Sequence, residues 1–188
     1  MRQLYWLVIF LVICSGALAQ NLEWGDDGSV TIITQDDGER ITIPGDQIGT
    51  MFGPDQKPFE GVRIAITVNT GGPKGGISGP LYQLRPAWEQ LTGATLDIVE
   101  MPLPEQLPTT MNDLNLGLNQ FDGFIEGAWY MGEYVTPGYI IPVDDYIADE
   151  RFPQWDPAWF PPSLRAIHQW NGQYYATLND SDGQVLYW

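Results

Sequence analysis

The sequence predicts an α/β fold with a mainly parallel sheet flanked by helices and preceded by a small β-hairpin. Three alternating or apolar runs, at 62–68, 95–101 and 121–129, are typical of strands, and two stretches with helical spacing, at 80–91 and 107–118, lie between them. The order strand, helix, strand, helix, strand favours parallel strands joined by right-handed crossovers. We therefore expect the carboxyl ends of all three strands to emerge at one edge of the sheet.

Each helix is predicted from an apolar face. In the first, Pro86 is expected to kink the helix or to mark its true start, because a proline removes one backbone hydrogen bond, and Gly93 occupies the position where a helix stop is expected. The first helix is expected to bury Leu81, Leu84, Trp88 and Leu91, and the second Leu107, Met111, Leu114 and Leu118.

The first strand runs into a loop, 70–79, that contains five glycines and one proline. A phosphate-binding loop that begins at Gly71 would need Lys and Ser or Thr after its second glycine, but it has Ile77 and Ser78 there. In open α/β sheets ligands bind outside the carboxyl ends of the strands. The loop is therefore a candidate ligand site or a flexible connection. Trp129, which follows the third strand, is either a ligand contact or a core aromatic.

The first nineteen residues are predicted to be a secretory signal peptide (1–19). Arg2 supplies the charged start, 4–14 the apolar core, and 17–19 the small-x-small cleavage pattern. A lipid-modified Cys14 is the alternative, although Ile13 stands where lipoprotein signals have a small residue. Cleavage after Ala19 removes Cys14, the single cysteine of the sequence. The formal net charge of -16 disfavours nucleic acid and anionic membranes as partners, because both are negatively charged. We expect an exported protein without stable membrane insertion.

Residues 20–60 are predicted to form a hairpin extension and a linker. The alternating runs 30–34 and 40–43 flank Asp37-Gly38, a pair favoured in hairpin turns. A calcium loop with Gly38 at its sixth position would place Ile33, which cannot ligate a cation, at its first. Residues 45–60 are rich in Gly, Pro and Asp, which is typical of a linker.

Short elements are expected after 130. A helical turn should end at Pro137, and Asp144 is expected to cap another turn, although Asp144 and Asp145 could instead form a catalytic pair. Asp156-Pro157 is typical of a helix start, with a helix over 160–167.

The last part of the chain is predicted to be a hairpin and two strands. His168 is the single histidine and is expected to be a structural surface residue rather than part of a metal site or catalytic triad. Asn171-Gly172 predicts a hairpin turn, followed by a strand over 174–178, a polar turn over 179–183 and the start of another strand.

Several of these stretches, taken in order, resemble extracellular solute-binding proteins of the type II periplasmic kind, the sugar-binding branch that serves ABC importers. The resemblance covers 61–188 and is carried by the signal peptide and by GVRIAITVNTGG, AWEQLTGATLDIVEMP, FDGFIEGAW, YIIPVDDYIAD and NGQYYATLNDSDGQVLYW.

The resemblance implies two α/β lobes that hold a sugar or related polar solute in the cleft between them and deliver it to the permease subunits of the importer in the periplasm. It implies no catalysis, cofactor or metal. The ligand contacts that it implies for this lobe are Asn69, Thr70, Gly71, Trp129, Tyr130, Asn179, Asp180 and Asp182.

On this resemblance 61–188 is a truncated N-terminal lobe and the second lobe is missing, so we expect weak or no solute binding by the lobe alone. The hairpin extension has no counterpart in the family pattern. Two alternatives stay open: a secreted carbohydrate-acting enzyme that uses Asp180 and Asp182 as a carboxylate pair, and an exported structural or adhesive module.

Overall fold

The computed structural model describes residues 19–34 and 40–178. The predicted signal peptide up to residue 18, the Asp37-Gly38 turn and the predicted contacts Asn179, Asp180 and Asp182 lie outside this part of the chain.

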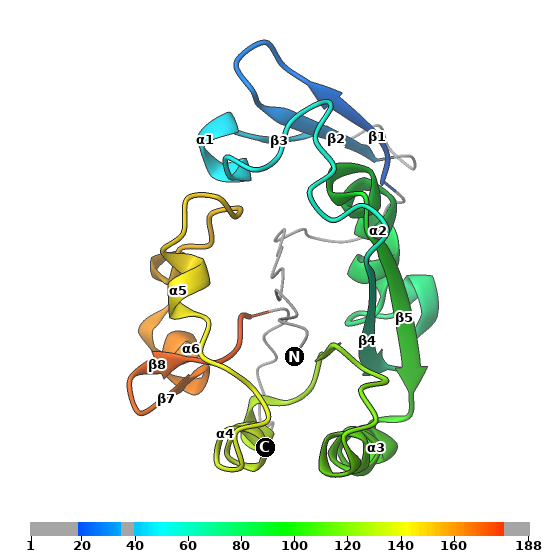
Figure 1. Ribbon diagram of the computed structural model, residues 1–188, viewed down its shortest axis with the longest axis vertical. Coiled ribbons are helices and arrows are strands. Elements are labelled where there is room, and N and C mark those ends of the chain that lie inside the picture. The colour runs from blue at the N-terminus through cyan, green and yellow to red at the C-terminus, as the bar shows by residue number, and fades with distance from the viewer. Residues whose placement is uncertain (1–18, 35–39, 179–188) are drawn as a thin grey trace, which may run out of the picture.

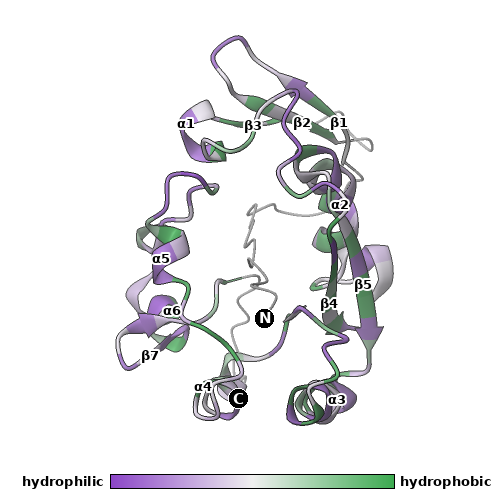
Figure 2. Cartoon of the chain, viewed as in Figure 1, coloured by the Kyte–Doolittle hydropathy of each residue, from purple (hydrophilic) through white to green (hydrophobic). Residues whose placement is uncertain are grey.

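A parallel three-stranded sheet forms the centre of the fold, which confirms the predicted α/β class. It contains β4 (Arg63–Asn69), β5 (Thr95–Met101) and β6 (Gly123–Phe124), in the order β5-β4-β6. β4 and β5 pair over their full length, and Figure 2 shows hydrophobic stretches along both. β6 is much shorter than the predicted 121–129, because the chain makes its last bond to β4 at Ile125 and then turns into a 3-10 helix.

The first crossover helix, α2 (Gly79–Thr92), joins β4 to β5. The helix begins at Gly79, so Pro86 does not mark its start. Pro86 lies instead in the interior of the helix, where it is exposed. Gly93 ends the helix at φ 77° and donates its N–H to the Glu89 carbonyl. Of the predicted face only Leu91 is fully buried, together with Ala87 and Thr92.

The second crossover helix, α3 (Leu103–Leu116), overturns the predicted apolar face. Its buried residues are polar: Gln106, Thr110 and Asp113. The predicted core residues Leu107, Met111 and Leu114 are only half-buried, and Leu118, beyond the helix end, is exposed. The inward face supplies hydrogen-bond partners to neighbouring segments: Gln106 Nε2 donates to the Ile125 carbonyl, and Asp113 Oδ1 accepts from the Gln120 N–H.

The N-terminal extension is a three-stranded antiparallel sheet rather than a lone hairpin. β2 (Val30–Thr34) and β3 (Arg40–Ile43) match the predicted hairpin strands, and β1 (Ala19–Trp24) adds to the outer side of β2. The segment that we expected to be a linker contains α1 (Gly45–Ile48) and is packed. Its buried residues complete an apolar cluster with the sheet and with α2, formed by Val30, Ile32, Ile48, Phe52, Ala87 and Leu91.

Short elements complete the fold. They are η1 (Gly72–Lys74), η2 (Ala128–Tyr130), α4 (Met131–Val135), α5 (Asp144–Ile147), η3 (Pro157–Trp159), α6 (Pro162–Ile167), β7 (Gln169–Trp170) and β8 (Gln173–Tyr174). Asp156 caps η3 as predicted, by accepting the Ala158 N–H. Asn171 and Gly172, at φ 50° and 82°, form the predicted turn between β7 and β8. Among the described residues, none of the helices is both long and apolar enough to cross a membrane.

Three predictions for this region are wrong. The strand predicted over 174–178 ends at Tyr174, and only one further backbone bond, from the Tyr175 N–H to the His168 carbonyl, links the chain to the residue before β7. Asp144 caps no helix; its Oδ2 accepts the Tyr174 N–H at 3.0 Å and ties α5 to the hairpin. His168 is buried rather than on the surface, because its ring packs at the end of α6 with Nδ1 2.7 Å from the Leu164 carbonyl.

Seen as in Figure 1, the elements follow one another around a ring, from β1–β3 through β4, β5, α3 and α4 to α5, α6, β7 and β8. Backbone hydrogen bonds close this ring between the N-terminal extension and the segment after α5. The N–H groups of Thr50 and Met51 donate to the carbonyls of Glu150 and Arg151, and the Gln154 N–H donates to the Gln47 carbonyl. The N-terminal extension is therefore attached both to α2 and to the segment after α5.

Candidate functional site

The strand order creates a topological switch point beside β4. The chain leaves β4 for β5 on one side, and it then returns past β4 to β6 on the other. β4 ends at Asn69 and β6 at Phe124, and the two strands pair in parallel through Ile66 and Thr67, so their carboxyl ends lie together. This is the position where open α/β sheets bind ligands.

Three of the predicted contacts lie at the end of β4: Asn69 is its last residue, and Thr70 and Gly71 follow it. Asn69 is half-buried, whereas Thr70 and Gly71 are exposed. The Thr70 N–H donates to the Met101 carbonyl at 3.0 Å, which ties this turn to the end of β5. The Asn69 amide and the Thr70 hydroxyl can each donate and accept hydrogen bonds, so this turn presents two versatile polar groups at the switch point.

The glycine loop after them is compact. The Gly72 N–H donates to Glu100 Oε1 at 2.7 Å, and Ser78 Oγ donates to the Gly72 carbonyl at 2.8 Å. A Cβ added at Gly71 would lie 2.9 Å from the Gly75 Cα, and one added at Gly75 would lie 2.7 Å from the Gly71 Cα. The glycines therefore permit a close approach of two backbone segments, and Glu100 anchors the loop to β5.

The other two described contacts, Trp129 and Tyr130, lie on η2 just beyond β6. Trp129 is 71% exposed, which excludes the core interpretation, and its ring centroid lies 5.7 Å from that of Tyr130 in an edge-to-face arrangement. The indole lies against the backbone of Gly127, because a Cβ added there would overlap the ring. An open aromatic surface thus stands next to the switch point.

Glu126, Thr110 and Tyr134 form a polar cluster in which Thr110 and Tyr134 are buried and Glu126 is half-buried. Glu126 Oε2 accepts the Tyr134 hydroxyl at 2.6 Å, and its Oε1 lies 3.1 Å from Thr110 Oγ1. Thr110 Oγ1 is also 2.7 Å from the Tyr134 hydroxyl. Burial raises the pKa of the Glu126 carboxyl, and the two hydrogen bonds oppose this rise only in part. Burial, together with the Glu126 hydrogen bond, also raises the pKa of Tyr134.

Sequence reasoning missed Glu126, Thr110 and Tyr134, and also the loop anchor Glu100. Glu126 carried one usable signal, since it is one of only two acidic residues, with Asp122, in the otherwise apolar and glycine-containing stretch FDGFIEGAW. Thr110 and Tyr134 carried none, since a polar residue on a helix is normally exposed and only packing against β6 buries these two.

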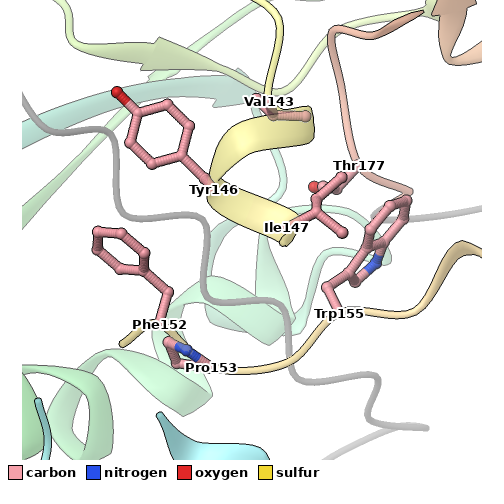
Figure 3. A pocket seen from close by; sticks show the side chains of 7 residues that line it. All are labelled: Val143, Tyr146, Ile147, Phe152, Pro153, Trp155 and Thr177. Atoms are coloured by element: carbon pink, nitrogen blue, oxygen red, sulfur yellow. The ribbon is translucent and has the colours of Figure 1, made fainter. Parts of the chain in front are cut away.

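A small cavity lies on the other side of the ring, between α5 and the chain that follows it (Figure 3). Its volume of about 20 Å³ is enough for roughly one water molecule, so it is a packing void rather than a solute site. The lining residues are Val143, Tyr146, Ile147, Phe152, Pro153, Trp155 and Thr177.

Acidic residues do not gather into a cation site within 19–34 and 40–178, where no group of three or more His, Cys, Asp or Glu side chains could hold a metal ion. Asp144, one member of the alternative catalytic pair with Asp145, accepts a hydrogen bond from the Tyr174 N–H.

The fold is similar to that of a solved solute-binding protein. A crystal structure of an ABC transporter solute-binding protein from Agrobacterium radiobacter K84, in complex with ribitol, superposes with a TM-score of 0.51 at 22% sequence identity. The match covers 63% of this chain and 29% of that one, so the chain spans less than a third of that protein. No family model matches the sequence, and no curated protein does. At this identity the similarity concerns the fold: a parallel sheet flanked by helices, as in a lobe of a periplasmic binding protein.

Proposed function

We propose that this protein is the substrate-binding component of an ABC importer and binds a sugar or related polar solute without converting it. The observation that supports the proposal is the switch point, where the parallel strands β4 and β6 end side by side, with polar residues after β4 and the exposed Trp129 after β6. The similarity in fold to a solute-binding protein supports the same class.

The chemistry of this edge suits a polyhydroxylated molecule. The Asn69 amide and the Thr70 hydroxyl can pair with solute hydroxyls, and the exposed face of Trp129 can stack on the apolar face of a sugar ring or polyol chain. We include Gly71 and Tyr130 in the site, and Asn179, Asp180 and Asp182 as further hydrogen-bonding groups from the chain after Leu178. A second lobe would close over the solute.

In this proposal residues 1–19 direct export and are removed, the mature protein works in the periplasm, and the permease subunits of the importer receive the solute. The solute-binding protein from Agrobacterium holds ribitol, which makes polyols the first probes to test beside sugars.

The test is calorimetric titration of the full-length mature protein with ribitol and a panel of sugars, followed by analysis of the recovered solute. We expect saturable heat for at least one solute and its recovery unchanged. Trp129→Ala should weaken that binding about tenfold, which corresponds to about 1.4 kcal/mol.

Trp159→Ala is the matched control, because Trp159 is also an exposed tryptophan on a 3-10 helix but lies on η3. Equal losses in the two variants would place the site elsewhere. Conversion of the solute would favour the carbohydrate-acting enzyme. If no sugar or polyol gave saturable heat, the proposed solute class would be contradicted.

A further inference from the structure

The segment that carries Trp129 and Tyr130 is held at both ends by one hydrogen-bonded cluster. Glu126 precedes η2, and Tyr134 follows it on α4. The Tyr134 hydroxyl donates to Glu126 Oε2 at 2.6 Å, so this bond closes the nine-residue segment 126–134 into a loop. Thr110 on α3 joins both, and thus three elements share one carboxyl group.

The cluster has more acceptors than protons when Glu126 is ionised. Thr110 Oγ1 lies within hydrogen-bonding distance of the Gln106 carbonyl (2.9 Å), of Glu126 Oε1 (3.1 Å) and of the Tyr134 hydroxyl (2.7 Å). With the contact between Tyr134 and Glu126 these make four close oxygen pairs, but the two hydroxyls supply one proton each, so two of the pairs lack a proton when Glu126 is ionised. A protonated carboxyl group supplies a third proton, which Glu126 can donate to Thr110 while Tyr134 donates to Glu126 and Thr110 to Gln106, so that only the pair of Thr110 and Tyr134 lacks one.

Within 19–34 and 40–178 no cation pairs with the Glu126 carboxylate. The ion pairs in these ranges are Arg40–Glu23, Arg63–Asp97 and Arg151–Asp149, and none includes Glu126. The groups that face it are the Thr110 hydroxyl from α3 and the phenol of Tyr134 from α4, and Tyr130 on η2 is close enough to Tyr134 to affect its pKa. Burial without a cation favours the neutral acid.

We propose that Glu126 is a positioning residue for the solute site: as a neutral acid it joins the end of β6 to α3 and α4 and holds Trp129 and Tyr130 in place. This inference rests on the proposed function, because it takes that aromatic pair as solute contacts. Ionisation of Glu126 would place an uncompensated carboxylate in the cluster, and its hydration would loosen the contact with Thr110 and Tyr134. Solute binding would then weaken as the pH rises, although Glu126 itself need not touch the solute.

The test follows Trp129 directly, by fluorine NMR of the full-length mature protein labelled with 5-fluorotryptophan, with the Trp129 resonance assigned from Trp129→Phe. In the wild type we expect this resonance to shift with pH above the ordinary range of a glutamate. Glu126→Gln keeps the shape and cannot ionise, so its resonance should stay at the low-pH wild-type position throughout. Glu126→Ala should displace the resonance at every pH, and Glu133→Gln, a change to an exposed acid on α4, should titrate like the wild type.

Two results would overturn the inference: the same pH-dependent shift in Glu126→Gln as in the wild type, or a Trp129 resonance that does not move with pH in the wild type. If Glu126→Ala fails to fold, the isosteric Gln variant still decides. Titration with ribitol and the sugar panel at two pH values separates the two proposals. Wild-type protein that binds no solute but shows the expected resonance shifts would refute the proposed function and leave the positioning of Trp129 standing.

Discussion

The molecule buries two clusters of opposite character. The apolar cluster of Val30, Ile32, Ile48, Phe52, Ala87 and Leu91 joins the N-terminal sheet to α2. The polar cluster of Gln106, Thr110, Glu126 and Tyr134 joins α3 and α4 to the end of β6. The first lies away from the switch point, and the second joins the residues before and after η2, which carries the aromatic pair.

The difference reflects what each kind of contact does. Apolar burial is non-directional and grows with area, so it stabilises a fold without demanding one arrangement. Hydrogen bonds among buried groups contribute less net free energy but require defined distances and angles. A polar cluster therefore suits a place where three elements must be set in one relative position. Substitutions in the two clusters should therefore lower the free energy of unfolding by different amounts.

The largest effect is expected in the apolar cluster. Ile32→Ala removes a side chain that is 3% exposed and leaves a cavity, which should lower the free energy of unfolding by about 3 kcal/mol. Denaturant unfolding measures this loss. Ile33→Ala is the control, because the neighbouring isoleucine is only partly buried on the other face of β2. Equal losses in the two variants would mean that the cluster is not the main source of stability there.

A smaller, pH-dependent effect is expected in the polar cluster. Since burial raises the pKa of Glu126, the folded chain retains its proton over a pH range in which the unfolded chain has lost it. The free energy of unfolding should therefore fall as the pH rises from the ordinary glutamate value of 4.5 through the raised folded value.

Unfolding of wild type and Glu126→Gln over this pH range isolates the contribution, because the many other acids are common to both. The difference between them should shift in favour of Gln as the pH rises. A constant difference would show that Glu126 ionises in the folded chain as readily as in the unfolded one.

The smallest effect on stability is expected at Gly127. Its φ of -68° suits any residue, but an alanine Cβ would overlap the exposed Trp129 ring. The ring can swing into solvent, so Gly127→Ala should change the free energy of unfolding by less than about 0.5 kcal/mol. It should nevertheless displace Trp129 and weaken solute binding severalfold. Acrylamide quenching and calorimetry test this pair of outcomes, and a large loss of stability would show that Trp129 is structurally more important than its exposure indicates.

Much of the fold could be predicted because it follows local patterns. Alternation placed β4 and β5 within a residue of their observed bounds, and Gly93 ended α2 where expected. Helical spacing failed for α3: the periodic leucines are half-buried or exposed, while Gln106 and Thr110 face inward. Periodicity shows which residues share a face but not what that face meets, and here it meets the Ile125 carbonyl and the side chains of Glu126 and Tyr134.

The candidate site divides in the same way. Asn69, Thr70 and Trp129 were predicted as contacts because strand ends can be recognised in a linear sequence, and their role remains a proposal. Glu126 and its partners could not be predicted, because a cluster drawn from α3, β6 and α4 exists only after packing.

The sequence by itself determined the α/β class, the ends of β4 and β5 and the composition of the site edge, since these depend on interactions between near neighbours in the chain. Only the tertiary structure decided that β6 ends at Phe124, that Pro86 lies inside a helix, that residues 45–60 are packed and that the half-buried Glu126 lies between two hydroxyl groups. The physical reason is that burial and the partners of a polar group are set by residues distant in the chain, and both control the pKa of that group and its capacity to position its neighbours.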